Sequence, residues 1–282
     1  LDATSLAAIG TVADIVDLRG ENRVLTSFGL QAVPESQLCG LHALIEAAGL
    51  KGQGVDSYAI GFRLAPVLNA AGRMGHARLA VELLTSTSEM RAKQIAEYLK
   101  EQNVQRQQCE RKMFKEACQI VIERGWNHPD RRSIVLAYEG WHTGVLGIVA
   151  SRLVDKFYRP AIMINASPGE SGAAQGSGRS VPGFCLLSAI HACSTHLASF
   201  GGHKMAAGLT IHPEKIEPFV NDFEGYAREN LNEEDVVARL DIDAVVPLRQ
   251  FTRDAVNQLE MLGPYGQGNP RPIFATMGVR LV

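Results

Sequence analysis

The stretch SIVLAYEGWHTGVLGIVASRLVDKFYRPAIMI, residues 133–164, decides the fold of the second half of the chain. It opens with a short apolar run at 133–138, passes through a glycine-containing turn into the amphipathic stretch 145–157, and closes with a second apolar run at 160–164. Strand, turn, helix and strand form a βαβ unit, which predicts two parallel strands joined by a right-handed crossover. The sequence therefore predicts an α/β domain.

The turn that leads into this helix carries Gly140, His142 and Gly144. At a helix N-terminus the free N–H groups and the helix dipole favour an anion. His142 then either contacts a phosphate or caps the helix without a ligand, and the residues leave both readings open.

A glycine-rich segment, GSGRSVPGF at 176–184, follows the βαβ unit. Arg179 offers a planar fork of donors that can grip a phosphate with two hydrogen bonds, and Ser177 adds a hydroxyl. We expect the glycines to form a loop that lets backbone N–H groups approach the anion. Taken alone, such a segment is more often an ordinary turn.

A second segment, FGGHKMAAGL at 200–209, adds an imidazole. Gly201 and Gly202 precede His203 and predict a turn that points the ring into a cleft. The two segments together predict a phosphate-binding site that contains Ser177, Arg179, Gly202 and His203.

A long helix is predicted between the two halves of the chain. Ser86 and Glu89 have the spacing of a capping box, residues 86–124 contain neither glycine nor proline, and Gly125 is a plausible stop. A helix of about 36 residues reaches roughly 54 Å at 1.5 Å per residue. That length is suited to a connector between domains.

Two residues of the N-terminal half attract attention. In IGTVADIVDL, residues 9–18, we expect an apolar strand that presents Asp14 at its end, although spacing alone makes Asp14 a surface acid. In NAAGRMG, residues 69–75, we expect a tight turn that carries Arg73, which by itself is more often structural or exposed to solvent.

The only Asp-x-Asp pair in the sequence is Asp241 with Asp243, within LDIDAVVPL. These carboxylates alternate with apolar residues, so they share one face of a short strand. An exposed strand face explains the pair better than a metal site does.

Composition narrows the class of protein. The chain has 282 residues, of which 46% are hydrophobic, enough for one large or two ordinary cores. The formal net charge of −2 gives no overall attraction to nucleic acid, so any binding requires a local basic groove. No stretch is long enough to span a membrane, and five scattered cysteines are typical of reduced thiols in the cytoplasm.

Several of these segments together resemble one family. Residues 140–164, GSGRSVPGF and FGGHKMAAGL look like the DHH-associated domain of the RecJ family of single-strand-specific exonucleases. LAAIGTVADIVDLRGENRVL at 6–25 resembles the last metal-ligand motif of a DHH phosphoesterase domain, and RLAPVLNAAGRMGHARLAVELL at 63–84 resembles the segment that closes it. LGPYGQGNPRPIF at 262–274 is similar to the start of the family's OB-type domain.

The resemblance implies an α/β fold class in four parts. These are the C-terminal part of a DHH phosphoesterase domain at 1–85, a long interdomain helix at 86–125, a DHH-associated domain at 126–235, and the beginning of an OB-type nucleic-acid-binding domain at 236–282. The family's other metal-ligand motifs, including its Asp-His-His triplet, are absent from the sequence. We therefore expect a fragment that lacks the N-terminal catalytic motifs and is inactive alone.

The resemblance also implies two-metal phosphodiester hydrolysis with Mn²⁺ or Mg²⁺, in which Asp14 is a metal ligand. It assigns His203, Arg179 and Arg73 to catalysis. It assigns the binding of the substrate phosphate to five residues, which are Ser177, Arg179, Arg73, His142 and Gly202.

The function implied is a metal-dependent exodeoxyribonuclease that degrades single-stranded DNA from its 5′ end in recombination and repair. The implied partners are a single-strand-binding protein and a helicase. The resemblance implies no association with a membrane. One alternative is a DHH-family phosphodiesterase for short oligonucleotides or cyclic dinucleotides, which usually lacks both the long connector and the 262–274 segment. The other alternative is a non-catalytic nucleic-acid-binding module.

Overall fold

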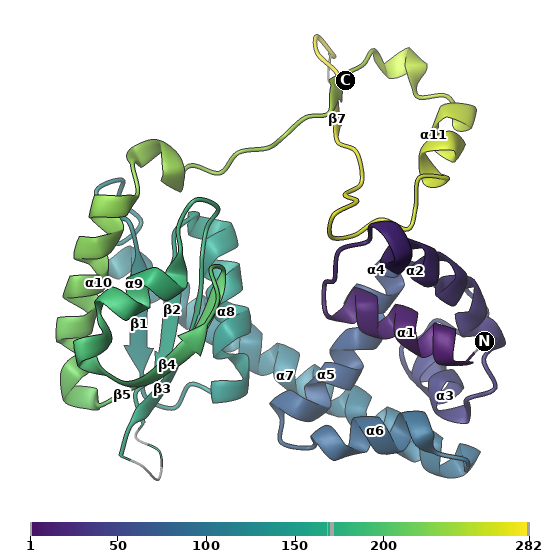
Figure 1. The fold of residues 1–282 in the computed structure, drawn as a ribbon, viewed down its shortest axis with the longest axis horizontal. Helices are drawn as coiled ribbons and strands as arrows, with labels where there is room; N and C mark the ends of the chain where they lie inside the picture. Colours follow the sequence, from purple (N-terminus) through teal and green to yellow (C-terminus); the bar gives the residue numbers. More distant parts are fainter. Residues whose placement is uncertain (1, 168, 170–171, 281–282) are drawn as a thin grey trace. The chain divides into compact units, whose positions relative to one another are not determined.

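The computed structural model describes residues 2–167, 169 and 172–280 (Figure 1). These residues form two compact units. The first unit contains the chain up to Val104 together with the chain from Leu240 onward, and the second contains Gln105–Arg239. The boundary at 104 falls inside the longest helix, α7 (Glu89–Glu123).

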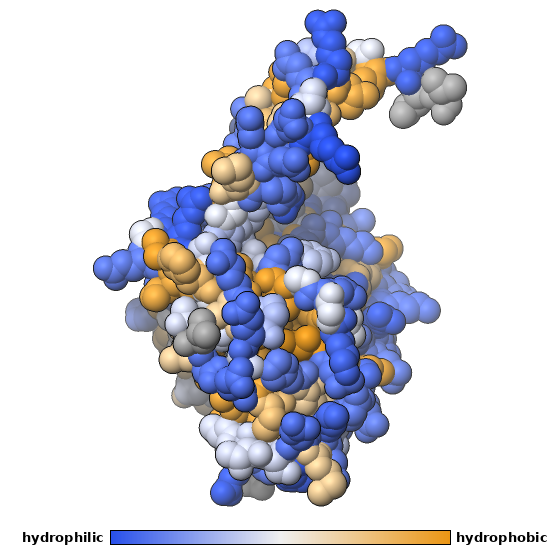
Figure 2. All heavy atoms as spheres, turned by 90° about the vertical axis from the view of Figure 1, so that its right-hand side faces the viewer, coloured by the Kyte–Doolittle hydropathy of each residue, from blue (hydrophilic) through white to orange (hydrophobic). Residues whose placement is uncertain are grey.

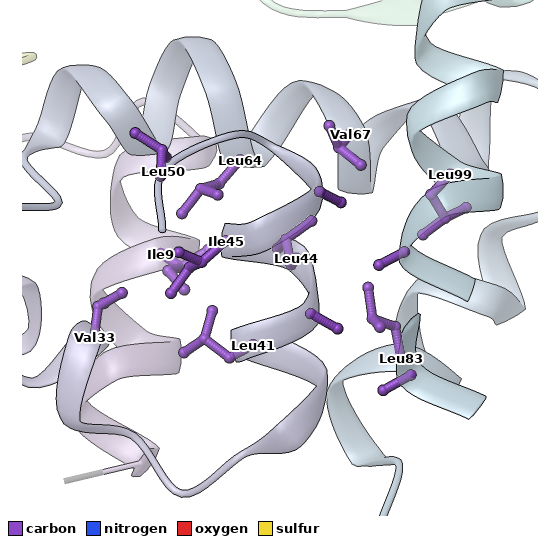
Figure 3. Packing of buried hydrophobic residues seen from close by; sticks show 14 of the residues in the cluster. Ile9, Val33, Leu41, Leu44, Ile45, Leu50, Leu64, Val67, Leu83 and Leu99 are labelled. Carbon is purple, nitrogen blue, oxygen red and sulfur yellow. The ribbon is translucent and has the colours of Figure 1, made fainter. Parts of the chain in front are cut away.

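The first unit is helical in its N-terminal part, and its core lies among short helices (Figure 3). Leu41, Leu44 and Leu64 are inaccessible to solvent in this core. The helices are α1 (Asp2–Ala13), α2 (Gly20–Ala32), α3 (Cys39–Ala47), α4 (Ser57–Ala59), a π-helix (Ile60–Leu64), α5 (Ala65–Arg73) and α6 (Ala77–Thr85), with a 3₁₀ turn at Val33–Glu35.

The expected strand at residues 9–18 is wrong, because this stretch contains the end of helix α1. Ser5, Ala8 and Ile9 are buried at helical spacing. Helix α2 packs closely on the same face, since a Cβ atom on Gly29 would lie 2.4 Å from the Cβ of Ala8. Tertiary packing of α1 against α2 therefore selects a helix where apolar residues alone suggested a strand.

Helix α7 confirms the predicted long helix, with 35 residues and a stop at Gly125, whose φ is +66°. Its start differs from the prediction. The hydroxyl of Ser88 accepts a hydrogen bond from the N–H of Arg91 at 3.4 Å, so the cap is Ser88 and not Ser86. Ile95 and Leu99 are buried in the core of the first unit, whereas Val121 is buried in a core of the second.

The second unit is a five-stranded sheet with helices on both faces (Figure 1). Its strand order is β1-β2-β3-β5-β4. The strands are β1 (Ile134–Tyr138), β2 (Ala161–Asn165), β3 (Ala174–Arg179), β4 (Leu197–Gly202) and β5 (Ala206–Ile211). The helices are α8 (Thr143–Phe157), α9 (Leu186–Ala192) and α10 (Ile216–Asn230), with 3₁₀ turns at Ser194–His196, Pro213–Lys215 and Glu233–Val236.

The predicted βαβ unit is confirmed, because β1 and β2 pair in parallel on either side of α8 in the sequence. Strand β3 then pairs antiparallel with both β2 and β5. Alternate side chains of β1 and β2 enter two separate cores. Val135 and Ile162 pack with the residues of α9 and α10, whereas Ile134 and Met163 pack with those of α7 and α8.

The C-terminal part of the first unit contains β6 (Ala244–Val245), a 3₁₀ turn (Leu248–Gln250), α11 (Arg253–Glu260) and β7 (Phe274–Ala275). Strands β6 and β7 pair in parallel. The carboxylate of Asp243 accepts a hydrogen bond from the N–H of Ile273 at 2.8 Å, so it stabilises this pairing. Asp241 and Asp243 both precede β6, so the expectation that they share one face of a strand is wrong.

Hydrophobic side chains remain on the surface of the first unit. Phe28 and Phe62 are 64% and 70% exposed, and Met261 is 82% exposed. One face of the molecule shows hydrophobic residues in small groups on a largely hydrophilic surface (Figure 2). None of the helices in the described part of the chain combines the length and the apolar character needed to cross a lipid bilayer.

Candidate phosphate-binding site

The segment GSGR, residues 176–179, is a strand and not a loop, because it belongs to β3. Gly176 and Gly178 face a buried core. A Cβ atom on Gly176 would lie 2.8 Å from Cδ1 of Leu209, and one on Gly178 would lie 3.0 Å from Cγ1 of Ile162. The expectation that these glycines bring N–H groups to an anion is therefore wrong. Packing requires them, and β3 lies between two paired strands that use its backbone.

Ser177 and Arg179 alternate with these glycines and so point to the opposite face of the sheet. Both side chains are half-buried. The guanidinium of Arg179 donates through Nη1 to the carbonyl of Gly178 at 2.7 Å and to the hydroxyl of Ser177 at 3.3 Å. These bonds hold the cation beside the hydroxyl, which is the combination that an oxyanion needs.

Gly147 in helix α8 leaves the space that this pair occupies. A Cβ atom on Gly147 would lie 2.8 Å from Nη2 of Arg179 and 2.9 Å from Oγ of Ser177. Sequence reasoning missed Gly147. The available signal was a glycine in the middle of a helix, where it costs about 1 kcal/mol relative to alanine and so calls for a reason in packing.

His203 follows β4 in the connection to β5, and its side chain is exposed. Its N–H donates to the carbonyl of Ala206 at 2.8 Å, and its Nδ1 accepts from the N–H of Met205 at 3.3 Å. Gly202 has a φ of +151°, and a Cβ there would lie 2.4 Å from the oxygen of Ala206. Gly201 and Gly202 are the last two residues of β4, so the expected turn begins only at His203. Only glycine fits at position 202, and the turn that follows orients the imidazole through its Nδ1.

The strand register brings Arg179 and His203 to the same end of the sheet. Arg179 is in register with Ala206 of β5, and Ala206 is the residue to which His203 donates. The exposed cation Lys204 lies in the same turn, and its carbonyl accepts from the N–H of Leu186 at 2.9 Å. Sequence reasoning did not single out Lys204, although its place next to His203 was the signal.

A shallow cavity of about 340 Å³ lies on the sheet between the middle of β3 and its Gln175 end. Gly201 and Gly208 face each other across β4 and β5, and the hydroxyls of Ser199 and Thr210 lie 2.6 Å apart. The lining residues are Gln175, Gly176, Ser199, Phe200, Gly201, Gly208, Leu209 and Thr210. The paired glycines leave backbone accessible to a bound group.

His142 is the N-cap of α8, and its Nδ1 accepts a hydrogen bond from the N–H of Gly144 at 3.2 Å. Of the two readings of this turn, the geometry matches the cap. His142 follows β1, whose last residue Tyr138 is in register with Asn165, and Asn165 with Gln175. Gln175 is four residues from Arg179, about 13 Å along the strand. His142 therefore lies nearer the other end of β3.

Cys193 and His196, three residues apart, belong to no metal-holding group among the described side chains. Burial raises the pKa of the Cys193 thiol to about 11, and the charge of Asp222 adds to this. Nε2 of His196 lies 2.6 Å from the carboxylate of Asp222. In contrast, a hydrogen bond from the hydroxyl of Ser188 lowers the pKa of Cys185.

Asp14 and Arg73 lie in the first unit, and both side chains are exposed. Asp14 follows the end of α1, with its N–H bonded to the carbonyl of Gly10 at 3.0 Å. Arg73 is the last residue of α5 and precedes the turn at Gly75, whose φ is +90°. The expected tight turn thus begins after Arg73 and does not carry it.

The donors described here do not by themselves fit a divalent cation. Among the residues that the structure describes, no three His, Cys, Asp or Glu side chains are grouped so as to hold a metal. Asp14 offers one carboxylate, whereas Mg²⁺ requires a nearly ideal octahedron of ligands.

Comparison with known proteins identifies the class. A family model described as the DHHA1 domain matches residues 131–229, and a model described as the RecJ OB domain matches residues 242–282. The sheet with its α8 face is thus a DHHA1 domain.

Relatives and solved structures extend the match. The single-stranded-DNA-specific exonuclease RecJ of Bacillus subtilis (strain 168) is 40% identical over 95% of this chain and 34% of its own length. The crystal structure of RecJ in complex with Mg²⁺ from Thermus thermophilus superposes with a TM-score of 0.86 at 32% identity, over 97% of this chain and 41% of that one. A crystal structure of exonuclease RecJ bound to manganese has a TM-score of 0.70 at 33% identity, over 84% of this chain and 57% of that one.

The chain belongs to the RecJ family, and the expected α/β fold class is confirmed. It spans about a third of the length of the Bacillus relative that it matches.

Proposed function

We propose that this chain forms the strand-end-binding part of a single-stranded-DNA-specific 5′–3′ exonuclease. The observation that carries the proposal is the placement of Ser177, Arg179 and His203 at one end of the DHHA1 sheet. The relatives are single-stranded-DNA-specific exonucleases RecJ, which supports single-stranded DNA as the substrate.

In this proposal Arg179 binds the phosphate at the strand end. Its guanidinium is oriented by the carbonyl of Gly178, and Ser177 supplies a hydroxyl beside it. His203 presents its ring from a turn that Gly202 makes possible, and so places a further donor near the phosphate. Such fixed donors neutralise charge without reorganisation during the reaction.

The remaining assigned residues bind other parts of the DNA strand. Arg73 contacts a substrate phosphate from the first unit. His142, nearer the other end of β3, contacts a different phosphate through the ring nitrogen that does not cap α8. The division at 1–85, 86–125, 126–235 and 236–282 is part of the same proposal.

Asp14 is proposed as one ligand of an Mn²⁺ or Mg²⁺ site whose other ligands are not among the described residues. Crystal structures of RecJ from Thermus thermophilus contain Mg²⁺ or Mn²⁺. When bound, such ions supply an activated water and stabilise the leaving oxygen. Because one carboxylate is too few, we expect this chain alone to bind strand ends without cutting them.

The proposal places the activity among metal-dependent hydrolases of phosphodiester bonds. We further propose that the protein acts in DNA recombination and repair in the cytoplasm, with a single-strand-binding protein and a helicase as partners.

Of the two alternative functions, one is disfavoured by the sequence match, and the other is favoured for the isolated chain. The match of residues 242–282 to the RecJ OB domain, together with the 35-residue α7, disfavours a phosphodiesterase for oligonucleotides or cyclic dinucleotides. A non-catalytic binding module is favoured for the isolated chain by the absence of a metal-holding cluster among its described side chains.

The deciding experiment compares the affinity of this chain for short single-stranded DNA with a 5′-phosphate and with a 5′-hydroxyl, at fixed moderate salt. We expect the phosphate to be preferred. Arg179→Ala should reduce the preference by about 1.5 to 3 kcal/mol, the scale of a hydrogen bond to a charged group. Lys215→Ala, which removes an exposed charge elsewhere in the same unit, is the matched control.

Equal affinities for the two DNA ends would remove Ser177, Arg179 and His203 from strand-end recognition. Hydrolysis with Mn²⁺ is measured in parallel. Turnover by this chain alone would show that it contains further metal ligands and would exclude the binding-module alternative.

A further inference from the structure

Residues 262–271, LGPYGQGNPR, fold into a compact turn that we call the clasp. The side-chain amide of Asn269 donates to the carbonyls of Leu262 and Pro264 at 3.0 and 2.9 Å. Gly266 and Asn269 pair their backbones in a short antiparallel bridge. The clasp is therefore shaped by its own hydrogen bonds.

The clasp is also tied to helix α11. Arg271 forms two hydrogen bonds with the carboxylate of Glu260, at 2.6 and 3.2 Å. The same guanidinium lies 4.8 Å from the centre of the Tyr265 ring. The hydroxyl of Tyr265 donates to the carbonyl of Leu259. These contacts join the clasp to the part of the chain that matches the OB domain.

The outer side of the clasp binds the loop that follows Asp14. The N–H of Leu18 donates to the carbonyl of Gln267 at 2.7 Å. Nε of Arg19 donates to the carbonyl of Gly268 at 2.9 Å. Residues 14–19, which we call the Asp14 loop, are thus bonded to a segment 249 positions later in the sequence.

Two further side chains complete the attachment, and one of them, Arg23, also donates through Nη2 to the carbonyl of Gly263 at 3.5 Å. Nη2 of Arg23 donates to the carbonyl of Leu262 at 2.5 Å, and the hydroxyl of Ser57 donates to the carbonyl of Tyr265 at 2.6 Å. Five carbonyls of the clasp therefore accept from four residues of the N-terminal helical region.

The glycines of the clasp allow this approach. A Cβ atom on Gly266 would lie 2.7 Å from Cδ1 of Leu18, a side chain that is 2% exposed. Gly268 has a φ of +74°, and a Cβ there would lie 3.1 Å from Nε of Arg19. Larger residues would push the clasp away from the loop.

The Asp14 loop requires such a restraint. Ile15 has a φ of +57°, a conformation that costs about 1 to 2 kcal/mol for an L-residue and is a true outlier for a β-branched one. Its side chain is 71% exposed, so local burial does not hold it. A strained backbone conformation persists where the surrounding structure holds it in place, and the hydrogen bonds from the clasp hold the Asp14 loop in this way.

We propose that the clasp fixes the Asp14 loop, and that Arg19 and Arg23 are positioning residues for it. The inference rests on the proposed function only in taking Asp14 as a metal ligand. It assigns to a segment within the OB-matching region a role that is separate from holding the DNA strand. A displacement of that region would release the loop that carries Asp14.

Amide hydrogen exchange of this chain, without metal or DNA, tests the proposal. The probe is the amide of Leu18, which bonds directly to the clasp. The disrupting variants are Arg23→Ala and Gly266→Ala, and Arg23→Lys tests rescue because lysine can still donate to one carbonyl. The controls are Arg249→Ala, at an exposed position, and Gly54→Ala, where no described atom lies within 4 Å of the added Cβ.

We expect both disrupting variants to accelerate exchange at Leu18 by about tenfold, the effect of losing roughly one hydrogen bond. Arg23→Lys should restore most of the protection, and the controls should match the parent chain. Unchanged exchange at Leu18 would overturn the proposal, as would equal acceleration at Leu41 and Leu44 in the helical core. Since strand-end affinity is measured separately, failure of either proposal leaves the other standing.

Discussion

Two glycine-rich segments of this chain look alike in sequence and differ in backbone conformation. In β3, Gly176 and Gly178 are buried and leave room for Leu209 and Ile162 of the core. In the clasp, Gly268 has a φ of +74° and lies against polar groups of a distant loop. Gly176 and Gly178 are needed for packing within the sheet, whereas Gly268 is needed for a backbone conformation with a positive φ. Glycine content alone therefore does not distinguish a strand from a binding loop.

The largest expected effect is that of Gly202→Ala, at the end of β4 just before the turn to β5. Its Cβ would lie 2.4 Å from the oxygen of Ala206 and 2.5 Å from the Cα of Ala207, and backbone atoms cannot rotate away. Overpacking and a strained φ together should cost about 3 to 4 kcal/mol. Chemical denaturation measures this loss, and a cost below about 1 kcal/mol would show that the turn adapts.

Gly176→Ala and Gly178→Ala come next, at about 1 to 3 kcal/mol each from overpacking. The nearest atoms that the new methyl groups would meet are ends of flexible side chains, which can partly yield. Gly201→Ala is the matched control in the same sheet, because no described atom lies within 4 Å of its added Cβ. Thermal unfolding should separate these variants. Equal stability of all three would contradict a packing role for the β3 glycines.

Gly268→Ala should destabilise the first unit by about 1 to 2 kcal/mol, since alanine is strained at a positive φ that glycine adopts freely. The effect should be confined to the clasp and the Asp14 loop. Hydrogen exchange resolved by peptide is the measurement, with β1 of the second unit as an internal reference. If protection falls in β1 as well, the clasp is not the local device that the contacts suggest.

The smallest effect concerns Lys204 in the turn beside His203. Lys204→Ala should weaken binding of single-stranded DNA slightly and lower the slope of log affinity against log salt by about 0.7, the value for one phosphate contact on a single strand. Lys215→Ala should leave the slope unchanged. A salt titration with both variants decides whether Lys204 contacts the strand.

Local patterns predicted several elements correctly. The parallel pair β1 and β2 follows from apolar runs around an amphipathic stretch, and the end of α7 follows from Gly125. Patterns failed for α1, whose apolar residues suit a helix or a strand until α2 packs against them. They failed again for β3, because glycine and serine are not typical of strands. Each glycine is needed there because a side chain from another element occupies the space where its Cβ would lie.

The candidate site was predictable in its residue types and not in its geometry. Arg179, Ser177 and His203 could be named from donors and neighbouring glycines, since charge, hydroxyl and imidazole are properties of single residues. Their common position depends on the register of β3 with β5, and the space for them depends on Gly147 in α8. Both are contacts between residues far apart in the sequence.

The family, the βαβ unit, the long helix and the chemistry available for binding a phosphate all follow from the order of residues, because periodicity, turn residues and side-chain chemistry are local properties. Three features depend instead on the folded chain: which glycines make room for the core, which end of the sheet gathers Arg179 with His203, and how the clasp holds the Asp14 loop. The physical reason is that strand register and close packing arise from contacts across long sequence separations, which local patterns do not specify position by position.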